Sequence, residues 1–197
     1  NWLPPDNYQE NPVSVIAHRT SPTNIGLSLL ANLSAYDFGY ILTGELIART
    51  SNAFSSMNSM ERYRGHFFNW YDTQTLKPLR PLYISSVDSG NLAAHLLTLQ
   101  QGLLTLPDRT IHGPRLFDGI SDTFQILLEH TEKSIPVQVT QFRTYLNAIL
   151  HEQPVTLAYL RKCLEKLTES SSGILHTLVV DSDEQFSVWA HKLLSLI

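Results

Sequence analysis

The chain is poor in cysteine, in charged residues and in long apolar runs. Its single cysteine, Cys163, excludes an internal disulfide bond and a cysteine-ligated metal cluster. No apolar run reaches the roughly 18 residues that a membrane-spanning helix needs. Charged residues make up only 16% of the 197 positions, below the usual share of about 25%. We therefore expect much of the surface to be neutral and polar, or to be covered by a partner.

Several kinds of functional site also lack their sequence patterns. The formal net charge is -4, and no basic stripe indicates a nucleic-acid partner. The histidines do not fall at metal-ligand spacings, and single histidines usually have structural roles. A glycine-rich phosphate loop and a G-x-S-x-G nucleophile elbow are both missing. The sequence therefore predicts no metal, no cofactor and no nucleic-acid partner for this chain.

The two ends of the sequence are typical of a piece of a longer protein. The sequence begins at Asn1 rather than at a methionine, and it stops at Ile197 within an apolar periodic segment that no glycine caps. A helical unit cut in this way exposes apolar surface. This expectation predicts a homodimer formed through that surface.

What the sequence does contain is mostly helical periodicity, which predicts a mainly α protein. Ser21 is typical of an N-cap before a first-turn proline, and apolar residues then recur at helical spacing up to Gly39. This helix and another from about 85 to 106 carry almost no charge, so we expect both to be buried on most sides as inner helices of a helical barrel. A more polar outer helix over residues 43–63, capped by Gly65, separates them.

The remaining segments complete this outline. Residues 1–20 predict an extended lead-in, and short extended pieces at 67–71 and 76–84, with a turn between them, predict a short β-hairpin. Amphipathic helices follow, so the chain divides into a first part, 1–106, and a helical extension, 107–197. The helices expected in the extension cover residues 116–130, 137–152, 156–168 and 182–197, with breaks at 134–136 and 170–173.

The stretch from Glu61 to His95 combines aromatic rings with side chains that hydrogen-bond well. A sugar has apolar C–H faces and a rim of hydroxyl groups, so aromatic faces beside fixed polar groups suit a carbohydrate. The same pattern fits a hairpin whose aromatics are core and whose polar residues cap turns, which is the commoner role. Polar clusters also stand at the starts of both uncharged helices, RTSPTN and SSVDSGN, and would share one rim of a cavity if both helices are inner ones.

Five motifs, in order along the chain, resemble those of the bacterial cyclic β-1,2-glucan synthases. Several long motifs in the right order are far more specific than any single one. The resemblance is strong over residues 1–106 and weak beyond them. The motifs are WLPPDNYQE (Trp2–Glu10), AHRTSPTNIGL (Ala17–Leu27), DFGY (Asp37–Tyr40), YRGHFFNWYDT (Tyr63–Thr73) and SSVDSGNLAAHL (Ser85–Leu96).

The resemblance implies a large inner-membrane protein with several functional regions. In that family a glycosyltransferase region uses UDP-glucose, several segments span the membrane, a middle helical-barrel domain processes glycosidic bonds, and a C-terminal domain is phosphorylase-like. This chain would be the start of the middle domain, an (α/α)6 barrel that closes linear β-1,2-glucan into a ring by transglycosylation. UDP-glucose would bind elsewhere in the parent protein, and this chain would lie on the cytoplasmic side of the membrane.

Retaining transglycosylation needs two carboxyl groups about 5–5.5 Å apart, one as nucleophile and one as acid/base. Among the carboxylates of the first part, Asp37 is the least easily assigned to a structural role. The resemblance implies that the catalytic pair lies beyond this chain, so we expect the chain to be inactive alone and to contact substrate instead. The candidates weighed are Glu10, Asp37, Glu61, Asp72 and Asp88.

Substrate contact is expected from the polar clusters and from an aromatic ring that stacks on glucose. Arg19 and Asp88 could instead pair as a structural bridge between the helix starts, and both interpretations stay open. A second hypothesis makes the segment a structural module that docks the membrane transferase region to the rest of the enzyme without touching sugar. The expected partners are a β-1,2-glucan oligosaccharide and the rest of the parent polypeptide. The expected sugar-binding residues are Arg19, Thr20, Asn24, Asp37, Arg62, His66, Asn69, Trp70, Asp72, Ser86, Asp88 and Asn91.

Overall fold

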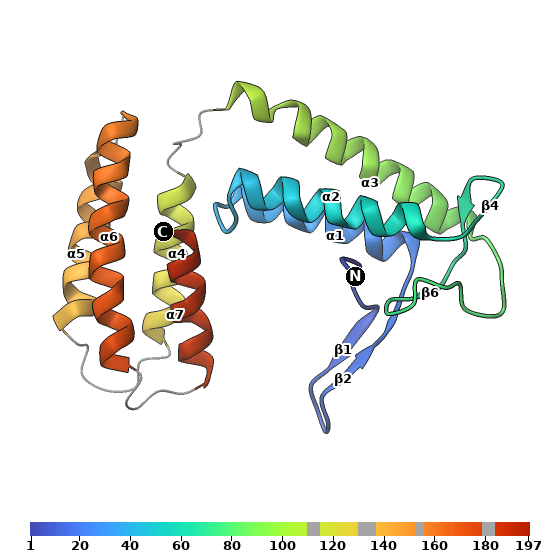
Figure 1. The fold of residues 1–197 in the computed structure, drawn as a ribbon, viewed down its shortest axis with the longest axis horizontal. Coiled ribbons are helices and arrows are strands. Elements are labelled where there is room, and N and C mark those ends of the chain that lie inside the picture. Colours follow the sequence, from blue (N-terminus) through green and yellow to red (C-terminus); the bar gives the residue numbers. More distant parts are fainter. Residues whose placement is uncertain (110–114, 130–136, 153–155, 179–183) are drawn as a thin grey trace. The chain divides into compact units, whose positions relative to one another are not determined.

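The computed structural model describes residues 1–109, 115–129, 137–152, 156–178 and 184–197 (Figure 1). The chain divides into two compact units, each with its own hydrophobic core. Unit 1 contains residues 1–35 and 43–109, and unit 2 contains residues 36–42 and 110–197. Helices dominate both units, which confirms the mainly α class. The barrel arrangement and the functional division of the chain stay predictions.

Unit 1 begins with short antiparallel strands that the sequence analysis treats only as an extended lead-in. β1 (Asn7–Gln9) pairs with β2 (Val15–Ala17) in a hairpin whose residues are mostly exposed. β3 (Arg19–Thr20) pairs with β6 (Tyr71–Asp72), so that Arg19 lies opposite Asp72. The second pairing joins the lead-in to the aromatic segment.

A third strand pair explains the role of Gly65. β4 (Arg62–Tyr63) and β5 (His66–Phe67) are linked by Arg64 and Gly65, whose φ angles are 51° and 87°. Positive φ at both central residues is typical of a type I′ hairpin turn, and glycine adopts it without strain. The prediction that Gly65 caps the second helix is therefore wrong, because that helix stops at Ser59, before the hairpin.

The helices α1 (Pro22–Asp37) and α2 (Thr43–Ser59) lie between β3 and β4 in the sequence, and α3 (Ser86–Leu104) follows β6. The predicted start of α1 is confirmed, because the Asn24 backbone N–H donates to the Ser21 hydroxyl at 3.2 Å. The start of α3 is built alike, since the Asp88 backbone N–H donates to the Ser85 hydroxyl at 3.1 Å. In both helices a serine supplies a partner that the first turn of the backbone lacks.

α1 and α3 run parallel to each other and pack closely. A Cβ atom at Gly26 of α1 would overlap the imidazole ring of His95 on α3. A Cβ atom at Gly102 of α3 would overlap the end of the Leu33 side chain on α1. The two contacts advance in the same direction along both helices, which makes them parallel. α2 runs back along α1 after a short loop (Figure 1).

Tyr71 belongs to the core of unit 1, and its side chain is fully buried. Its hydroxyl donates to the Glu61 carbonyl at 2.6 Å and accepts from the Phe68 N–H at 2.7 Å. Burial raises the pKa of Tyr71, although the hydrogen bond from the Phe68 backbone acts in the opposite direction. All three helices supply apolar side chains to this core, among them Leu29, Met57 and Leu99.

Unit 2 consists mainly of four helices, α4 (Arg115–Glu129), α5 (Val137–Glu152), α6 (Leu157–Leu178) and α7 (Glu184–Leu196). α4 packs along α7 and α5 packs along α6. Phe124 and Phe142 meet in the core with ring centroids 4.7 Å apart. Within the described ranges, no helix has both the length and the apolar character needed to cross a bilayer.

The loop between α1 and α2 belongs to unit 2 and is anchored on α4. Gly39 has a φ of 77°, and a Cβ atom there would overlap the Arg115 carbonyl group. Asp37 forms an ion pair with Arg115 at 3.0 Å, and the Tyr40 hydroxyl donates to Asp122 at 3.0 Å. Residue 39 must therefore be glycine, both for its conformation and for the space available.

Some predicted boundaries change. α3 is followed by a short 3₁₀ turn, η1 (Leu106–Asp108). α6 continues to Leu178, so the predicted break at 170–173 is wrong. Serine and glycine are weak helix formers, but packing of α6 along α5 overrides that preference. The predicted break at 134–136 and the predicted start of the last helix at 182 lie outside the described residues.

α3 is less buried than predicted. Val87, Leu97 and Leu104 are 69%, 64% and 62% exposed, although the helix carries little charge. Burial on most sides is therefore wrong for α3 in this chain by itself. Its covered faces are those that meet α1 and the core of unit 1.

Candidate functional site

The starts of α1 and α3 meet at the carboxylate of Asp88. The Thr23 hydroxyl donates to Asp88 Oδ1 at 2.7 Å, and the Asn91 amide donates to the same Thr23 oxygen at 3.1 Å. The polar clusters RTSPTN and SSVDSGN therefore lie side by side. Asp88 also stands in the first turn of α3, where a carboxylate is stabilised by the positive end of the helix.

Asp88 is held in its charged form. Partial burial alone would raise the pKa of this carboxyl group. Hydrogen bonds from Ser85, Thr23 and Ser21 outweigh burial and hold the pKa of Asp88 below its ordinary value. A role as cap of α3 is also conceivable for Asp88 from its place at the helix start, but the structure gives that role to Ser85, and Asp88 lies in the first turn instead. The alternative pairing of Asp88 with Arg19 is wrong, because Arg19 binds another carboxylate.

Asn69 connects Asp88 to two aromatic side chains. With the amide oriented to satisfy both of its ends, the Asn69 nitrogen donates to Asp88 Oδ2 at 2.8 Å. In the same orientation, the Asn69 oxygen accepts from Trp70 Nε1 at 2.8 Å and from the Tyr83 hydroxyl at 2.8 Å. Asn69 is only 6% exposed, so a buried amide fixes the orientation of the indole.

Arg19 lies over the indole ring of Trp70. Its guanidinium carbon is 4.8 Å from the ring centroid, which is a cation–π distance. Arg19 Nη2 is 2.8 Å from Asp6 Oδ2, and the Asn24 amide donates to Oδ1 of the same carboxylate at 3.1 Å. The β3–β6 pairing produces this arrangement, because it sets Arg19 beside the segment that carries Trp70.

Two predicted residues lie on the β4–β5 hairpin. Arg62 and His66 are both exposed. The Arg62 guanidinium carbon is 4.3 Å from the Phe67 ring centroid, and Arg62 Nη2 donates to the Met57 carbonyl at 3.2 Å. These contacts hold the hairpin against the last turn of α2, which gives Arg62 a structural role.

Asp72 organises the turn that follows β6. Its Oδ1 accepts from the backbone N–H of Gln74 at 2.9 Å and from that of Thr75 at 2.7 Å. Hydrogen bonds from Thr75 are the main cause of a pKa below the ordinary value for Asp72. The predicted turn at residues 72–75 is confirmed, with Asp72 as its hydrogen-bond acceptor.

The other predicted residues are placed as follows. Asp37 belongs to unit 2 and pairs with Arg115. Thr20 is fully buried, and among the residues that the structure describes its hydroxyl has no hydrogen-bond partner. Ser86 is the exposed first residue of α3. Hydrogen bonds and ring contacts, in part through Asp6 and Thr23, thus connect six of the predicted residues, while a role of these residues in sugar binding stays a prediction. They are Arg19, Asn24, Asn69, Trp70, Asp88 and Asn91.

Three residues that the sequence analysis did not select complete this arrangement. Thr23 belongs to the RTSPTN cluster, and that place in the sequence was enough to select it as a candidate. Tyr83 belongs to the aromatic stretch and could have been chosen with Trp70. Asp6 had no such signal, because its contact depends on strand pairing. We call the connected set Asp6, Arg19, Asn69, Trp70, Tyr83 and Asp88 the Trp70 cluster.

The Trp70 cluster places apolar rings next to hydrogen-bonding groups. Trp70 is partly exposed and Tyr83 is 45% exposed, so both rings reach the surface. An indole of fixed orientation suits stacking on the apolar face of a sugar, while exposed polar groups suit its hydroxyls. The carboxylates of Asp6 and Asp88 are both engaged by internal hydrogen bonds, so the cluster suits binding better than proton transfer.

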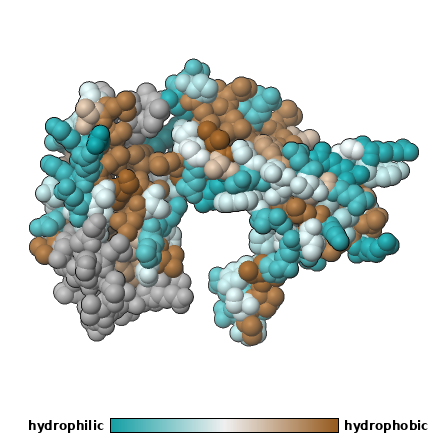
Figure 2. All heavy atoms as spheres, viewed as in Figure 1, coloured by the Kyte–Doolittle hydropathy of each residue, from teal (hydrophilic) through white to brown (hydrophobic). Residues whose placement is uncertain are grey.

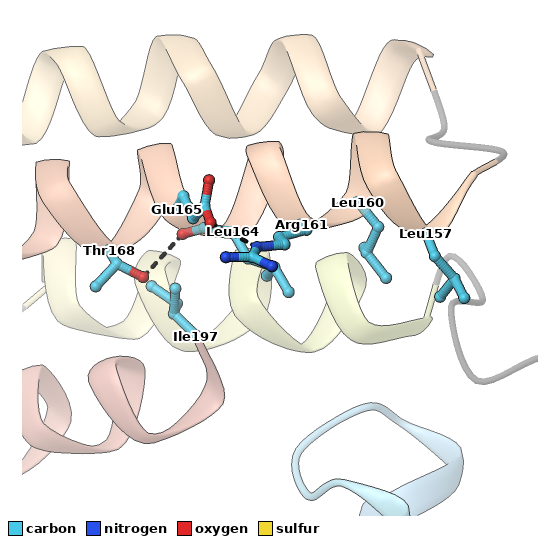
Figure 3. Close-up of a pocket in the computed structure, with 7 residues that line it drawn as sticks. All are labelled: Leu157, Leu160, Arg161, Leu164, Glu165, Thr168 and Ile197. Atoms are coloured by element: carbon cyan, nitrogen blue, oxygen red, sulfur yellow. Dashed lines mark hydrogen bonds and ion pairs between the residues drawn. The ribbon is translucent and has the colours of Figure 1, made fainter.

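An open pocket of about 420 Å³ lies on α6 in unit 2 (Figure 3). Arg161 and Glu165 form an ion pair beside it, with Arg161 Nε 2.7 Å from Glu165 Oε1. None of the predicted sugar-binding residues lines this pocket, and its walls are mostly aliphatic. The lining residues are Leu157, Leu160, Arg161, Leu164, Glu165, Thr168 and Ile197.

Comparison with known proteins identifies a relative along almost the whole chain. No known family profile matches the chain. The chain is 37% identical, over 217 aligned residues, to the cyclic β-(1,2)-glucan synthase NdvB of Rhizobium meliloti (strain 1021). The match covers 99% of this chain and 8% of that protein, so it extends well beyond the part in which the motifs are strong. The resemblance inferred from the motifs is thereby confirmed, and the chain is homologous to one segment of a cyclic β-(1,2)-glucan synthase.

Proposed function

We propose that this chain supplies part of a glucan-binding surface in the domain that closes linear β-1,2-glucan into a ring by transglycosylation. The relative, which is a cyclic β-(1,2)-glucan synthase, supports the synthase context. The chain spans 8% of the length of that relative, so the remaining activities belong to a much longer polypeptide in this proposal. The catalytic carboxylates and the UDP-glucose site lie elsewhere in that polypeptide, and this segment lies on the cytoplasmic side of the inner membrane.

The packing of the first three helices supports a place in an (α/α)6 barrel. In such a barrel, inner helices run parallel to one another and are separated in sequence by antiparallel outer helices. α1 and α3 are parallel, and α2 runs back between them in sequence. Arg49 of α2 lies 3.5 Å from the Asn32 side chain of α1, so α2 packs against the first inner helix. In this proposal the Trp70 cluster stands at the rim formed by the starts of the inner helices.

The observation that carries the binding proposal is the fixed, partly exposed indole of Trp70. Its Nε1 is held by Asn69 at 2.8 Å, and the Arg19 guanidinium lies 4.8 Å from its centroid. A ring that is already oriented loses little entropy when a sugar stacks on it. Purely structural packing of the ring would not require that it reach the surface.

Isothermal titration calorimetry with linear β-1,2-gluco-oligosaccharides tests this function. We expect the 197-residue chain to bind the oligosaccharide. The variant Trp70→Ala should bind it about tenfold more weakly or worse, which corresponds to a loss of at least ~1.4 kcal/mol in binding free energy. Trp2→Ala is the matched control, since Trp2 is 56% exposed and makes none of the contacts of the Trp70 cluster. A linear β-1,4-gluco-oligosaccharide is the control for linkage. Equal affinity of the Trp70 and Trp2 variants would contradict the proposal.

A second candidate function is favoured by the β1–β2 hairpin. Tyr8, Val15 and Ile16 are 54%, 51% and 47% exposed. An isolated two-stranded hairpin is marginal in water, so these apolar residues suit contact with another part of the synthase polypeptide. The segment would then dock the membrane transferase region to the rest of the enzyme. Ile16→Thr in the full-length synthase would reduce assembly and leave the glucan affinity of the isolated chain unchanged.

The homodimer expected from the sequence remains part of this proposal.

A further inference from the structure

Tyr83 is held beside Trp70 through both its backbone and its side chain. The Asn69 N–H donates to the Tyr83 carbonyl at 2.9 Å, and the Leu79 N–H donates to the Trp70 carbonyl at 2.8 Å. The segment 79–83 therefore lies along residues 69 and 70. The Tyr83 hydroxyl and Trp70 Nε1 both donate to the side-chain oxygen of Asn69, each at 2.8 Å. The polar ends of the two aromatic side chains thus meet at one oxygen of a buried amide.

Both aromatic rings also reach the surface. Tyr83 is 45% exposed, and Trp70 is partly exposed. On the face drawn in Figure 2, hydrophilic and hydrophobic residues are interspersed at the end of unit 1 that carries β4 and β6 in Figure 1. A mixed surface of this kind fits a sugar, which offers both C–H groups and hydroxyls, better than it fits a wholly apolar partner.

Arg19 restricts the way in which a sugar can meet Trp70. Its guanidinium covers one face of the indole, with the central carbon 4.8 Å from the ring centroid. A sugar can therefore stack only on the other face, and the next sugar of a chain must continue past an edge of the indole. The edge that carries Nε1 is the one beside the Tyr83 hydroxyl. A glucan that leaves Trp70 over this edge comes next to Tyr83.

We propose that Tyr83 is the second stacking residue of this surface, so that Trp70 and Tyr83 together bind two consecutive glucose units. This inference rests on the proposed function and deepens it, because it gives the length of glucan that the surface recognises. Asn69 holds the polar ends of both side chains, so each ring is oriented before the sugar arrives and loses little entropy on binding. The Tyr83 ring is the contact with the sugar, and the Tyr83 hydroxyl orients that ring.

The arrangement of the two rings favours the β-1,2 linkage. An amide oxygen accepts along two lone-pair directions in its own plane, so the two rings extend away from Asn69 in different directions. A β-1,2-glucan is linked through adjacent carbon atoms of each glucose ring, which turns the chain sharply. A β-1,4-glucan is linked through opposite ends of the ring, which extends the chain. Two rings arranged around a common point suit the turned chain better than the extended one.

NMR titration of the 197-residue chain with sugars of one and two units tests the role of Tyr83. The probes are methyl β-D-glucoside, the β-1,2-linked disaccharide of glucose and the β-1,4-linked disaccharide. We expect the β-1,2-linked disaccharide to bind about tenfold more tightly than the glucoside, which corresponds to a second ring contact of ~1.4 kcal/mol. The β-1,4-linked disaccharide should gain clearly less. Equal gains for the two linkages would overturn the linkage preference.

Variants at Tyr83 separate the effect of its ring from that of its hydroxyl. Tyr83→Ala should lose the tenfold gain, whereas Tyr83→Phe keeps the ring and should retain most of it. Tyr63→Ala is the matched control and should bind as the wild type does, since Tyr63 is 52% exposed on β4 and lies outside the Trp70 cluster. Circular dichroism checks the folding of each variant. If Tyr83→Ala does not fold, Tyr83→Leu takes its place, because leucine fills part of the same volume without an aromatic face.

The outcomes distinguish this inference from the proposed function on which it rests. If Trp70→Ala weakens binding of longer β-1,2-glucans but Tyr83→Ala keeps the disaccharide gain, the inference is overturned and the proposed function stands. Equal losses in Tyr83→Ala and Tyr83→Phe would trace the effect to the hydroxyl and contradict stacking on Tyr83. If the wild-type chain binds none of these sugars, including the longer β-1,2-glucans, both proposals are overturned.

Discussion

Asp88 links the two helix starts, and one side chain therefore serves local structure and the candidate site together. Its carboxylate accepts from Thr23 at 2.7 Å and, through Asn69, is connected to Trp70. Asn69 is buried and Asp88 is half-buried, so neither is free to adapt to a ligand. At the residue scale, we propose that Asp88 positions Trp70 through Asn69 and that Trp70 contacts the glucan.

The positioning role of Asp88 predicts a loss of stability in Asp88→Asn. We expect a loss of about 1 kcal/mol in the free energy of unfolding, typical of a damaged helix start. Asp108→Asn is the matched control, because Asp108 is exposed in η1. Urea unfolding followed by circular dichroism measures both variants. An unchanged midpoint in Asp88→Asn would contradict the role.

The pH dependence of stability gives a second test of Asp88. The pKa of its folded form lies below its ordinary value of about 3.9, so the unfolded chain binds the proton first as pH falls. The stabilisation is therefore present above about pH 5 and is lost below about pH 4. We expect the difference in unfolding free energy between wild type and Asp88→Asn to shrink between pH 5 and pH 3. If the difference in unfolding free energy instead grows toward acid pH, the stabilising role of the Asp88 carboxylate is contradicted.

At the scale of elements, the close approach of α1 and α3 is the contact on which the parallel arrangement depends. A Cβ atom at Gly26 would lie 2.9 Å from Cβ of His95, which is attached directly to the backbone and has little room to move. We expect Gly26→Ala to destabilise the chain by about 1–3 kcal/mol through overpacking. Gly44→Ala is the control, since a Cβ atom there would meet nothing within 4 Å. Thermal unfolding that ranks Gly44→Ala below Gly26→Ala would contradict this packing.

The loop between α1 and α2 gives a comparison between two glycines with positive φ. Gly39 and Gly65 have φ angles of 77° and 87°, but only Gly39 lies against backbone atoms of α4. Gly65→Ala should cost about 1–2 kcal/mol from conformation alone. Gly39→Ala should cost clearly more, because the added methyl also overlaps the Arg115 carbonyl group. Urea denaturation distinguishes the two, and equal losses would mean that the loop does not need its contact with α4.

Sequence patterns predict local structure in this chain well where the cause is local. The Ser21 cap of α1 and the Asp72 turn depend on residues within a few positions of each other, and both predictions are confirmed. The break predicted in α6 failed because packing along α5 overrode weak local helix preferences. Gly65 was assigned to the wrong element because a helix cap and a hairpin turn both require positive φ.

At the scale of the whole molecule, contacts between distant segments were the hardest to predict. The sequence left open whether Arg19 pairs with Asp88, and strand pairing places Arg19 between Asp6 and the Trp70 ring instead. The sequence also showed no sign of the division into units, because residues 36–42, which include the last two residues of α1, belong with the C-terminal helices. The motifs nevertheless predicted the relationship to cyclic β-1,2-glucan synthases, which the comparison extends to 99% of the chain.

The central claim is that the rim around Trp70 contacts β-1,2-glucan, and backbone NMR of the 197-residue chain tests it most directly. Titration with a linear β-1,2-gluco-oligosaccharide should shift amide signals of Arg19, Asn69, Trp70 and Tyr83, and the Trp70 indole N–H signal most strongly. The Trp189 indole signal on α7 is the internal control and should stay in place. Shifts confined to unit 2, or none in the Trp70 cluster up to millimolar sugar, would contradict the account.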